Sequence, residues 1–194
     1  VIVSGARFGD IEPCKCTRLK YGGVDREATL LQEFKRKNAT QICIDAGGFV
    51  APLFHAQERL KAVFTLRALA RMNFHAVNVG WSDLALGLPA LREQSRKTGV
   101  ELISANIIDM ETGEPAFPRY KTFDLPGEPA SRLLLIPLTD LYPHNEFNQE
   151  DFYRRNIKDK VKIRDPAMTV KKILSEQLRE SDIVVILLFA DPTT

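Results

Sequence analysis

The sequence predicts an α/β fold in which helices cover a sheet with mostly parallel central strands. Short apolar runs, typical of buried strands, alternate along the chain with longer segments whose apolar residues have helical spacing. The chain has 194 residues, of which 44% are hydrophobic and 27% are charged, and this balance suits a globular domain with a sizeable core. We therefore expect a single α/β domain over residues 1–194.

The first predicted elements are a strand, a loop, a helix and a second strand. Residues 1–5 form a short apolar run that ends at a glycine. Residues 10–23 contain a proline and two adjacent glycines and should form a loop. Apolar residues recur on one side of a helix in residues 25–37. Residues 41–46 contain the run Ile42-Cys43-Ile44, which is typical of a buried strand.

The middle of the chain continues the alternation. Residues 57–72 have the clearest helical pattern, and we expect one apolar face made of Leu60, Val63, Phe64 and Ala68. A third strand is predicted at residues 75–79, where the run ends at a glycine. Residues 89–98 should form another helix, because proline suits its first turn, and residues 100–104 read as a fourth strand.

The last part of the chain gives two more strands and one more helix. Residues 132–138 are apolar and should form a strand, whereas residues 145–163 are polar and charged and favour a long surface excursion. Residues 166–180 predict an amphipathic helix whose inward side chains are Val170, Ile173, Leu174 and Leu178. Residues 182–190 form a buried strand that is apolar on both faces, so we expect neighbouring structure on both sides of it.

Composition excludes several classes of protein. The net charge is +2, from 27 Lys and Arg against 25 Asp and Glu, which argues against a nucleic-acid surface. No apolar run approaches the ~18 residues of a membrane span, and no signal peptide is visible. Three cysteines, an odd number, do not make a disulfide framework.

Several short motifs, in their order and spacing, resemble one known family. They occur at residues 9–14 (GDIEPC), 22–29 (GGVDREAT), 45–47 (DAG), 76–80 (AVNVG), 104–107 (SANI), 112–115 (TGEP) and 182–185 (DIVV). Together they resemble the amino-terminal domain of calcineurin-like metallophosphoesterases, in the branch of exported bacterial 5′-nucleotidases and UDP-sugar hydrolases. The resemblance implies an αββα sandwich that is incomplete at its carboxyl-terminal end, and an exported, periplasmic or cell-surface location.

The same resemblance implies a site for two metal ions, but its ligand positions hold other residues here. The family has Asp-x-His after the first strand, a bridging aspartate after the second, Asn-His after the third and Ser-His after the last. The residues that stand at these positions are Ala6, Phe8, Gly48, Trp81, Ser82, Leu188 and Phe189. Two adjacent cations require a bridging carboxylate. We therefore predict a vestigial site without a metal or other cofactor, in which Phe8, Gly48, Trp81 and Phe189 converge.

Two functions remain open on these observations. The first is a non-catalytic domain that serves as a binding or assembly module, with a protein partner or the missing carboxyl-terminal part of the same protein covering its last strand. The alternative is a metal-dependent phosphoester hydrolase with a rebuilt site. Ser82 would be a candidate nucleophile in that case, although a serine that caps a helix is the more common role. Asp45 and Asp83 are expected to brace turns.

The cysteines and histidines give a further candidate site. Cys14 and Cys16 could supply two thiolates to a metal or redox site shared with a partner, or they could be inert residues of an exposed loop. Cys43 lies between two isoleucines and should be buried. The three histidines, His55, His75 and His144, are scattered along the chain and are expected to be solvated or satisfied in the core.

Overall fold

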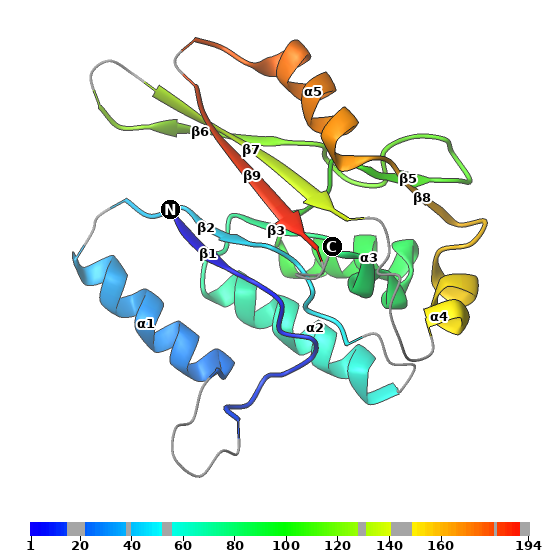
Figure 1. The fold of residues 1–194 in the computed structure, drawn as a ribbon. Helices are drawn as coiled ribbons and strands as arrows, with labels where there is room; N and C mark the ends of the chain where they lie inside the picture. Colours follow the sequence, from blue (N-terminus) through cyan, green and yellow to red (C-terminus); the bar gives the residue numbers. More distant parts are fainter. Residues whose placement is uncertain are drawn as a thin grey trace.

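The structure is a computed structural model, and it describes seven segments of the chain. These segments are residues 1–14, 22–37, 40–51, 56–127, 131–140, 149–180 and 182–190. Strands and helices alternate through most of them (Figure 1). No helix in these segments is long and apolar enough to cross a lipid bilayer.

The first sheet contains four parallel strands. In spatial order they are β1 (Ile2–Ser4), β2 (Cys43–Asp45), β3 (Ala76–Asn78) and β4 (Leu102–Ile103). Three helices cover one face of this sheet, as Figure 1 shows. They are α1 (Val24–Lys37), α2 (Ala56–Arg71) and α3 (Leu88–Thr98). The predicted parallel strands and their crossover helices are therefore confirmed.

A second sheet packs against the other face of the first. Its strands are, in spatial order, β6 (Lys121–Leu125), β7 (Ser131–Thr139) and β9 (Asp182–Phe189). β6 runs antiparallel to β7, whereas β9 runs parallel to it over its whole length. Helix α5 (Pro166–Gln177) lies on the outer face of this sheet (Figure 1). Its amino end is capped by Asp165, whose carboxylate accepts a hydrogen bond from the Met168 N–H at 2.7 Å.

Three apolar clusters fill the spaces between these four layers. Strand residues alternate between faces, and the clusters follow that alternation. Cys43 and Val77 pack against the helices below the first sheet. Ile44 packs between the sheets with Leu135, whereas the next residue along β7, Leu134, faces α5. The predicted αββα sandwich is confirmed by this layering.

The polar segment at residues 145–163 was expected to be a surface excursion, and this expectation is wrong for its described part. Residues 149–163 contain helix α4 (Gln149–Asn156) and strand β8 (Val161–Ile163). β8 pairs antiparallel with β5 (Ile107–Asp109), which the sequence analysis also missed. Three widely spaced apolar residues, Phe152, Ile157 and Val161, are buried and hold this segment against the core. Because these apolar residues are widely spaced among charged ones, the sequence shows no helical or strand pattern for α4 and β8.

Helix α2 buries a different face from the predicted one. Leu60 and Phe64 are 72% and 54% exposed, whereas Ala62, Leu66 and Leu69 are fully buried. Both sets have helical spacing, so periodicity alone could not choose between them. The buried set packs in the same apolar cluster as Cys43 and Val77 of the first sheet. In α5 the prediction is wrong only for Leu178, which lies just beyond the last helical residue and is 53% exposed.

Strand β9 forms an edge of the second sheet. Within the described residues it pairs only with β7. Three apolar side chains on it, Ile183, Ile186 and Leu188, are about half exposed, at 52%, 51% and 48%. At its start, Asp182 accepts hydrogen bonds from the guanidinium of Arg132, which hold the pKa of this carboxyl at about 2.

Candidate functional site

The carboxyl ends of β1, β2, β3 and β9 meet at one edge of the two sheets. Residues with positive φ angles follow β1 and β2 there, and a short 3-10 helix follows β3. Parallel strands bring such turns together, which is why sites in open α/β sheets are built at this edge. The predicted convergence can therefore be tested residue by residue.

The turn after β1 lies directly beside the turn after β2. The N–H of Ala6 donates to the carbonyl oxygen of Gly47 at 2.7 Å, and the N–H of Phe8 donates to that of Gly48 at the same distance. Ala6 and Phe8 both have positive φ angles, of 53° and 46°. Non-glycine residues seldom adopt this conformation, so the turn holds local strain that these two hydrogen bonds must offset.

The ring of Phe189 fills the space above the turns after β2 and β3. Phe189 is only 5% exposed. A Cβ atom on Gly48 would overlap this ring, and a Cβ atom on Gly80 would lie 2.5 Å from Phe189 Cδ1. The rings of Phe8 and Trp81 flank it, with centroids 5.8 Å and 6.2 Å away. An aromatic cluster therefore occupies this edge, and the two glycines make room for it.

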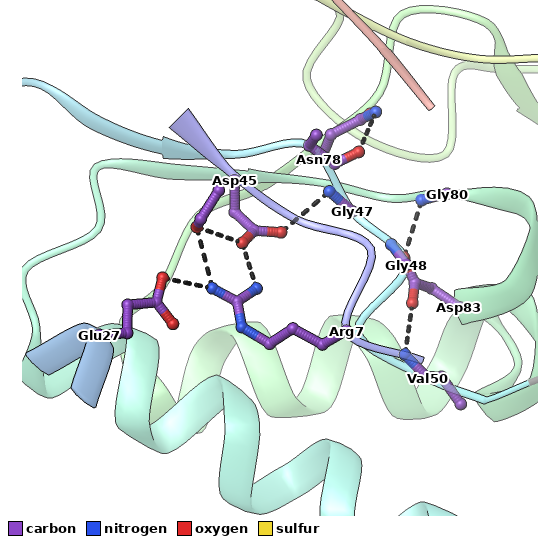
Figure 2. Close-up of polar contacts among 11 residues, drawn as sticks. Arg7, Glu27, Asp45, Gly47, Gly48, Val50, Asn78, Gly80 and Asp83 are labelled. Carbon is purple, nitrogen blue, oxygen red and sulfur yellow. Dashed lines mark hydrogen bonds and ion pairs between the residues drawn. The ribbon is translucent and has the colours of Figure 1, made fainter. Parts of the chain in front are cut away.

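A partly buried ion-pair network joins the turn after β1 to β2 and α1 (Figure 2). The guanidinium of Arg7 donates to the carboxylate of Asp45 and, at 2.6 Å, to that of Glu27 on α1. Asp45 is fully buried, and its other oxygen accepts from the Gly47 N–H at 2.9 Å. The hydroxyl of Ser4 donates to Asp45 at 2.9 Å. Burial opposes the charge of Arg7, but the two carboxylates outweigh it and raise the pKa of Arg7.

Asp83 links the turn after β2 to the turn after β3 (Figure 2). Its carboxylate accepts hydrogen bonds at 2.8 Å from the backbone N–H groups of Gly48, Val50 and Gly80. The side chain is completely buried. Desolvation raises the pKa of Asp83 to about 7, although the three donors favour the charged form. The prediction that Asp45 and Asp83 brace turns is confirmed by these contacts.

Two asparagines connect this edge of the first sheet to the end of β7. The amide of Asn78 donates to the carbonyl oxygens of Ala46 and Leu138, at 3.0 Å and 2.7 Å. The amide of Asn106 donates to the carbonyl oxygen of Thr139 at 2.7 Å and accepts from its N–H at 3.0 Å. Oδ1 of Asn78 is buried and has no hydrogen-bond partner. These bonds fix the two sheets in register at the candidate site.

Five of the seven predicted site residues come together. Ala6, Phe8, Gly48, Trp81 and Phe189 are linked by the contacts described above. Leu188 does not belong with them, because successive strand residues point to opposite faces and its side chain is 48% exposed.

Ser82 lies beside the cluster in the short 3-10 helix η1 (Trp81–Leu86), where its side chain is fully buried. Its Oγ has no hydrogen-bond partner, so it neither caps the helix nor contacts a base that could activate it. The expectation of a capping serine is therefore wrong, and the cap is supplied by Asp83 instead.

The predicted thiolate site is described only in part. Cys14 is half-buried and lines a cavity of about 1030 Å³ between the turn after β1 and the first turns of α1 and α2. Cys16, His55 and His144 lie outside the described residues. Cys43 is buried as expected, and burial raises the pKa of its thiol. The Nδ1 atom of His75 accepts a hydrogen bond from the Cys43 N–H at 3.1 Å.

The residues at this edge do not fit a pair of metal ions. Ala6, Phe8, Gly48 and Trp81 offer no side-chain donor that suits a hard cation. The carboxylates of Asp45 and Asp83 are already satisfied by a guanidinium, a hydroxyl and backbone amides. Among the described residues, no three His, Cys, Asp or Glu side chains gather as a possible metal site. The unpartnered side-chain oxygens there belong to Asn78, Ser82 and Glu58, and only the last of these is a carboxylate.

The fold is that of the calcineurin-like phosphoesterases, as the comparison with solved structures shows. A 5′-nucleotidase precursor from Thermus thermophilus superposes with a TM-score of 0.74 over 97% of this chain at 20% identity. The calcineurin-like phosphoesterase YfkN from Bacillus subtilis superposes with a TM-score of 0.70 over 96% of this chain at 14% identity. The resemblance inferred from the short motifs is thus borne out at the level of the fold.

One curated relative also matches in sequence. It is a 2′,3′-cyclic-nucleotide 2′-phosphodiesterase/3′-nucleotidase from Yersinia enterocolitica, 26% identical over 111 residues. The match covers 54% of this chain and 17% of that protein. The chain likewise spans 36% of the Thermus protein and 60% of the Bacillus protein. No family model matches the chain.

Sequence reasoning found the two carboxylates of the polar part of the site, Asp45 and Asp83, but missed their partners. It did not single out Arg7, Glu27 or Thr139, whose partners lie far away along the chain. Arg7 stands between two substituted ligand positions, and a cation there was the one available signal. Its pairing with Asp45 requires β1 and β2 to be adjacent in the right register.

Proposed function

We propose that this chain is a phosphoesterase-fold domain that has no catalytic metal site and acts as a binding or assembly module. One observation carries this proposal. The ring of Phe189 fills the space over Gly48 and Gly80, at the position where the family resemblance implies a bridging carboxylate. The neighbouring carboxylates are held by Arg7 and by backbone amides. Apolar filling of a former polar site removes the cost of an unsatisfied cavity.

In this proposal, the exposed edge strand β9 is the surface through which the domain assembles. β9 presents an unpaired edge, within the described residues, and three half-exposed apolar side chains. Such an edge readily pairs with another strand. The occupant is a protein partner or a further part of the same protein, since the chain spans 36% of the Thermus relative. That relative is described as a precursor, which supports an exported location for this protein too.

Elemental analysis combined with a hydrolysis assay tests the proposal. The chain is produced in medium supplemented with manganese and zinc, and its metal content is measured after gel filtration. Hydrolysis of bis(p-nitrophenyl) phosphate and of 5′-AMP is then followed with and without added Mn²⁺. We expect substoichiometric metal and no turnover above buffer, because Ala, Phe, Gly and Trp cannot supply the binding energy of a metal site.

If hydrolysis is detected, the variants Asp45→Asn and Asp83→Asn show whether it depends on the carboxylates of the candidate site. Stoichiometric metal and turnover that disappear in either variant would overturn the proposal in favour of a rebuilt hydrolase site. The matched control is Asp10→Asn, which removes an exposed carboxylate at the mouth of the same edge. Metal that is lost only when Cys14 and Cys16 are replaced would leave the proposal intact and assign the thiolate site.

A further inference from the structure

A second cavity lies at the opposite end of the first sheet from the candidate site. Its volume is about 730 Å³, within the range of small-molecule sites. Gln41 and Cys43 line it where β2 begins, and Asn73 and His75 line it just before β3. Because the candidate site uses the carboxyl ends of the same strands, the two places are separated by the length of the sheet. Nothing in the proposed function involves this cavity.

The charge around the cavity has one sign. Lys35 on α1 and Arg71 at the end of α2 both line it. Both side chains are exposed, and neither has an ion-pair partner in the described part of the chain, whereas the less exposed Arg7, Arg92 and Arg132 are paired. The described residues that line the cavity include no Asp or Glu. In a chain whose net charge is only +2, this is a local concentration of positive charge.

A buried hydrogen-bond donor in the cavity wall also lacks a partner. Nε2 of Gln41 is inaccessible to solvent and makes no hydrogen bond. A ligand in the cavity cannot contact an atom that water does not reach, so the recognition of a ligand rests on the two cations. The two cations call for a group that carries negative charge and presents several acceptor oxygens.

The floor of the cavity is apolar. Leu31 and Cys43 are 7% and 4% exposed, and half-buried Met72 and Ala28 complete this side. A purely inorganic anion would leave the exposed parts of Met72 and Ala28 uncovered. An apolar body on the ligand would cover it, at about 25 cal/mol for each Å² removed from water.

We propose that this cavity binds a small organic anion. Its carboxylate or phosphonate-type head group is held by Lys35 and Arg71, which both line the cavity. Its apolar body lies on Leu31 and Met72. The shared chemistry is one acidic group with acceptor oxygens attached to a compact apolar group, and the test below separates the two head groups.

Calorimetric titration with two non-hydrolysable probes tests the inference. Benzoate and phenylphosphonate share an aromatic body and differ in the acidic group, and benzyl alcohol is the neutral control. The 194-residue chain is titrated with each, and the contact is mapped by amide chemical shifts. We expect at least one anion to bind with shifts at Gln41, Asn73 and His75, and benzyl alcohol to bind at least about tenfold more weakly, since two cations contribute. Comparing the two anions identifies the head group.

The double variant Lys35→Gln with Arg71→Gln should weaken anion binding about tenfold. The matched control is Lys37→Gln with Arg59→Gln, which removes the same charges from exposed positions of the same two helices outside the cavity. Equal weakening by both double variants, failure of both anions to bind, or shifts confined to other parts of the chain would each overturn the inference. The shift map is read on the unaltered chain, so a variant that misfolds does not decide the outcome.

Discussion

Phe189 and Gly48 depend on each other, and a double-mutant cycle measures that dependence. Gly48→Ala should destabilise the chain by about 2–4 kcal/mol, because the new methyl group meets the Phe189 ring and the residue keeps a φ of 71°. In a Phe189→Ala background the clash is absent, so the same change should cost only about 1 kcal/mol of backbone strain. Urea unfolding of the four proteins gives the coupling. Additive costs would contradict the packing described here.

Asp83 should make stability depend on pH. The pKa of Asp83 is about 7 in the folded chain and roughly 4 in an unfolded one. Its contribution to stability is therefore complete below pH ~4 and is lost as the pH rises through 7, by up to about 4 kcal/mol. Urea unfolding at several pH values, for the chain and for Asp83→Asn, should show a falling difference between them across this window. Asp10→Asn, at an exposed position, should follow the unaltered chain.

For single residues, the sequence predicted the aromatic cluster and the two turn-bracing aspartates, Asp45 and Asp83, but not the cation that pairs with Asp45. Phe8, Gly48, Trp81 and Phe189 could be placed because each follows a recognisable strand, and strand ends converge. Leu188 was misplaced because a one-residue difference along a strand reverses the side-chain direction. Arg7 was missed because an ion pair between residues 38 positions apart leaves no spacing signal.

Strand β9 should govern self-association of the chain. Ile186 is 51% exposed on a strand whose outer edge is unpaired within the described residues. A lysine there would resist strand pairing by charge and solvation. Ile186→Lys should therefore lower the association constant measured by sedimentation, with little change in stability. Leu60→Lys, which changes an even more exposed residue on α2, is the control. An equal effect of both changes would mean that association is nonspecific.

Elements were predictable where apolar residues are continuous or strictly periodic. The strands of the first sheet and β9 have such runs, and α5 starts at a proline after an aspartate cap. β8 and α4 were not predictable, because their burial rests on single residues such as Phe152 and Val161. The face of α2 was ambiguous for a different reason. Two apolar stripes compete on it, and only packing against the sheet selects the one that contains Ala62.

The layered architecture predicts which elements lose stability when a core residue is replaced. Leu134 and Leu135 are adjacent on β7 and fully buried, but they face α5 and the first sheet respectively. Alanine at either position should cost about 2–5 kcal/mol. Hydrogen exchange should then differ: Leu134→Ala should speed exchange in α5, and Leu135→Ala should speed it in β2 and β3. The same exchange pattern in both variants would mean that the layers do not respond separately.

The packing of Phe189 against Gly48 and Gly80 also limits which single substitutions the chain tolerates at this edge. An aspartate introduced at Gly48 would collide with the aromatic ring and would carry an unpaired charge into a buried space. A smaller residue at Phe189 alone would open a cavity with nothing to fill it. Either single substitution, at Gly48 or at Phe189, therefore gives a less stable chain. With the Phe189 ring in this position, only the smallest residues fit at Gly48 and Gly80, so an aspartate at Gly48 would require a second, simultaneous change at Phe189.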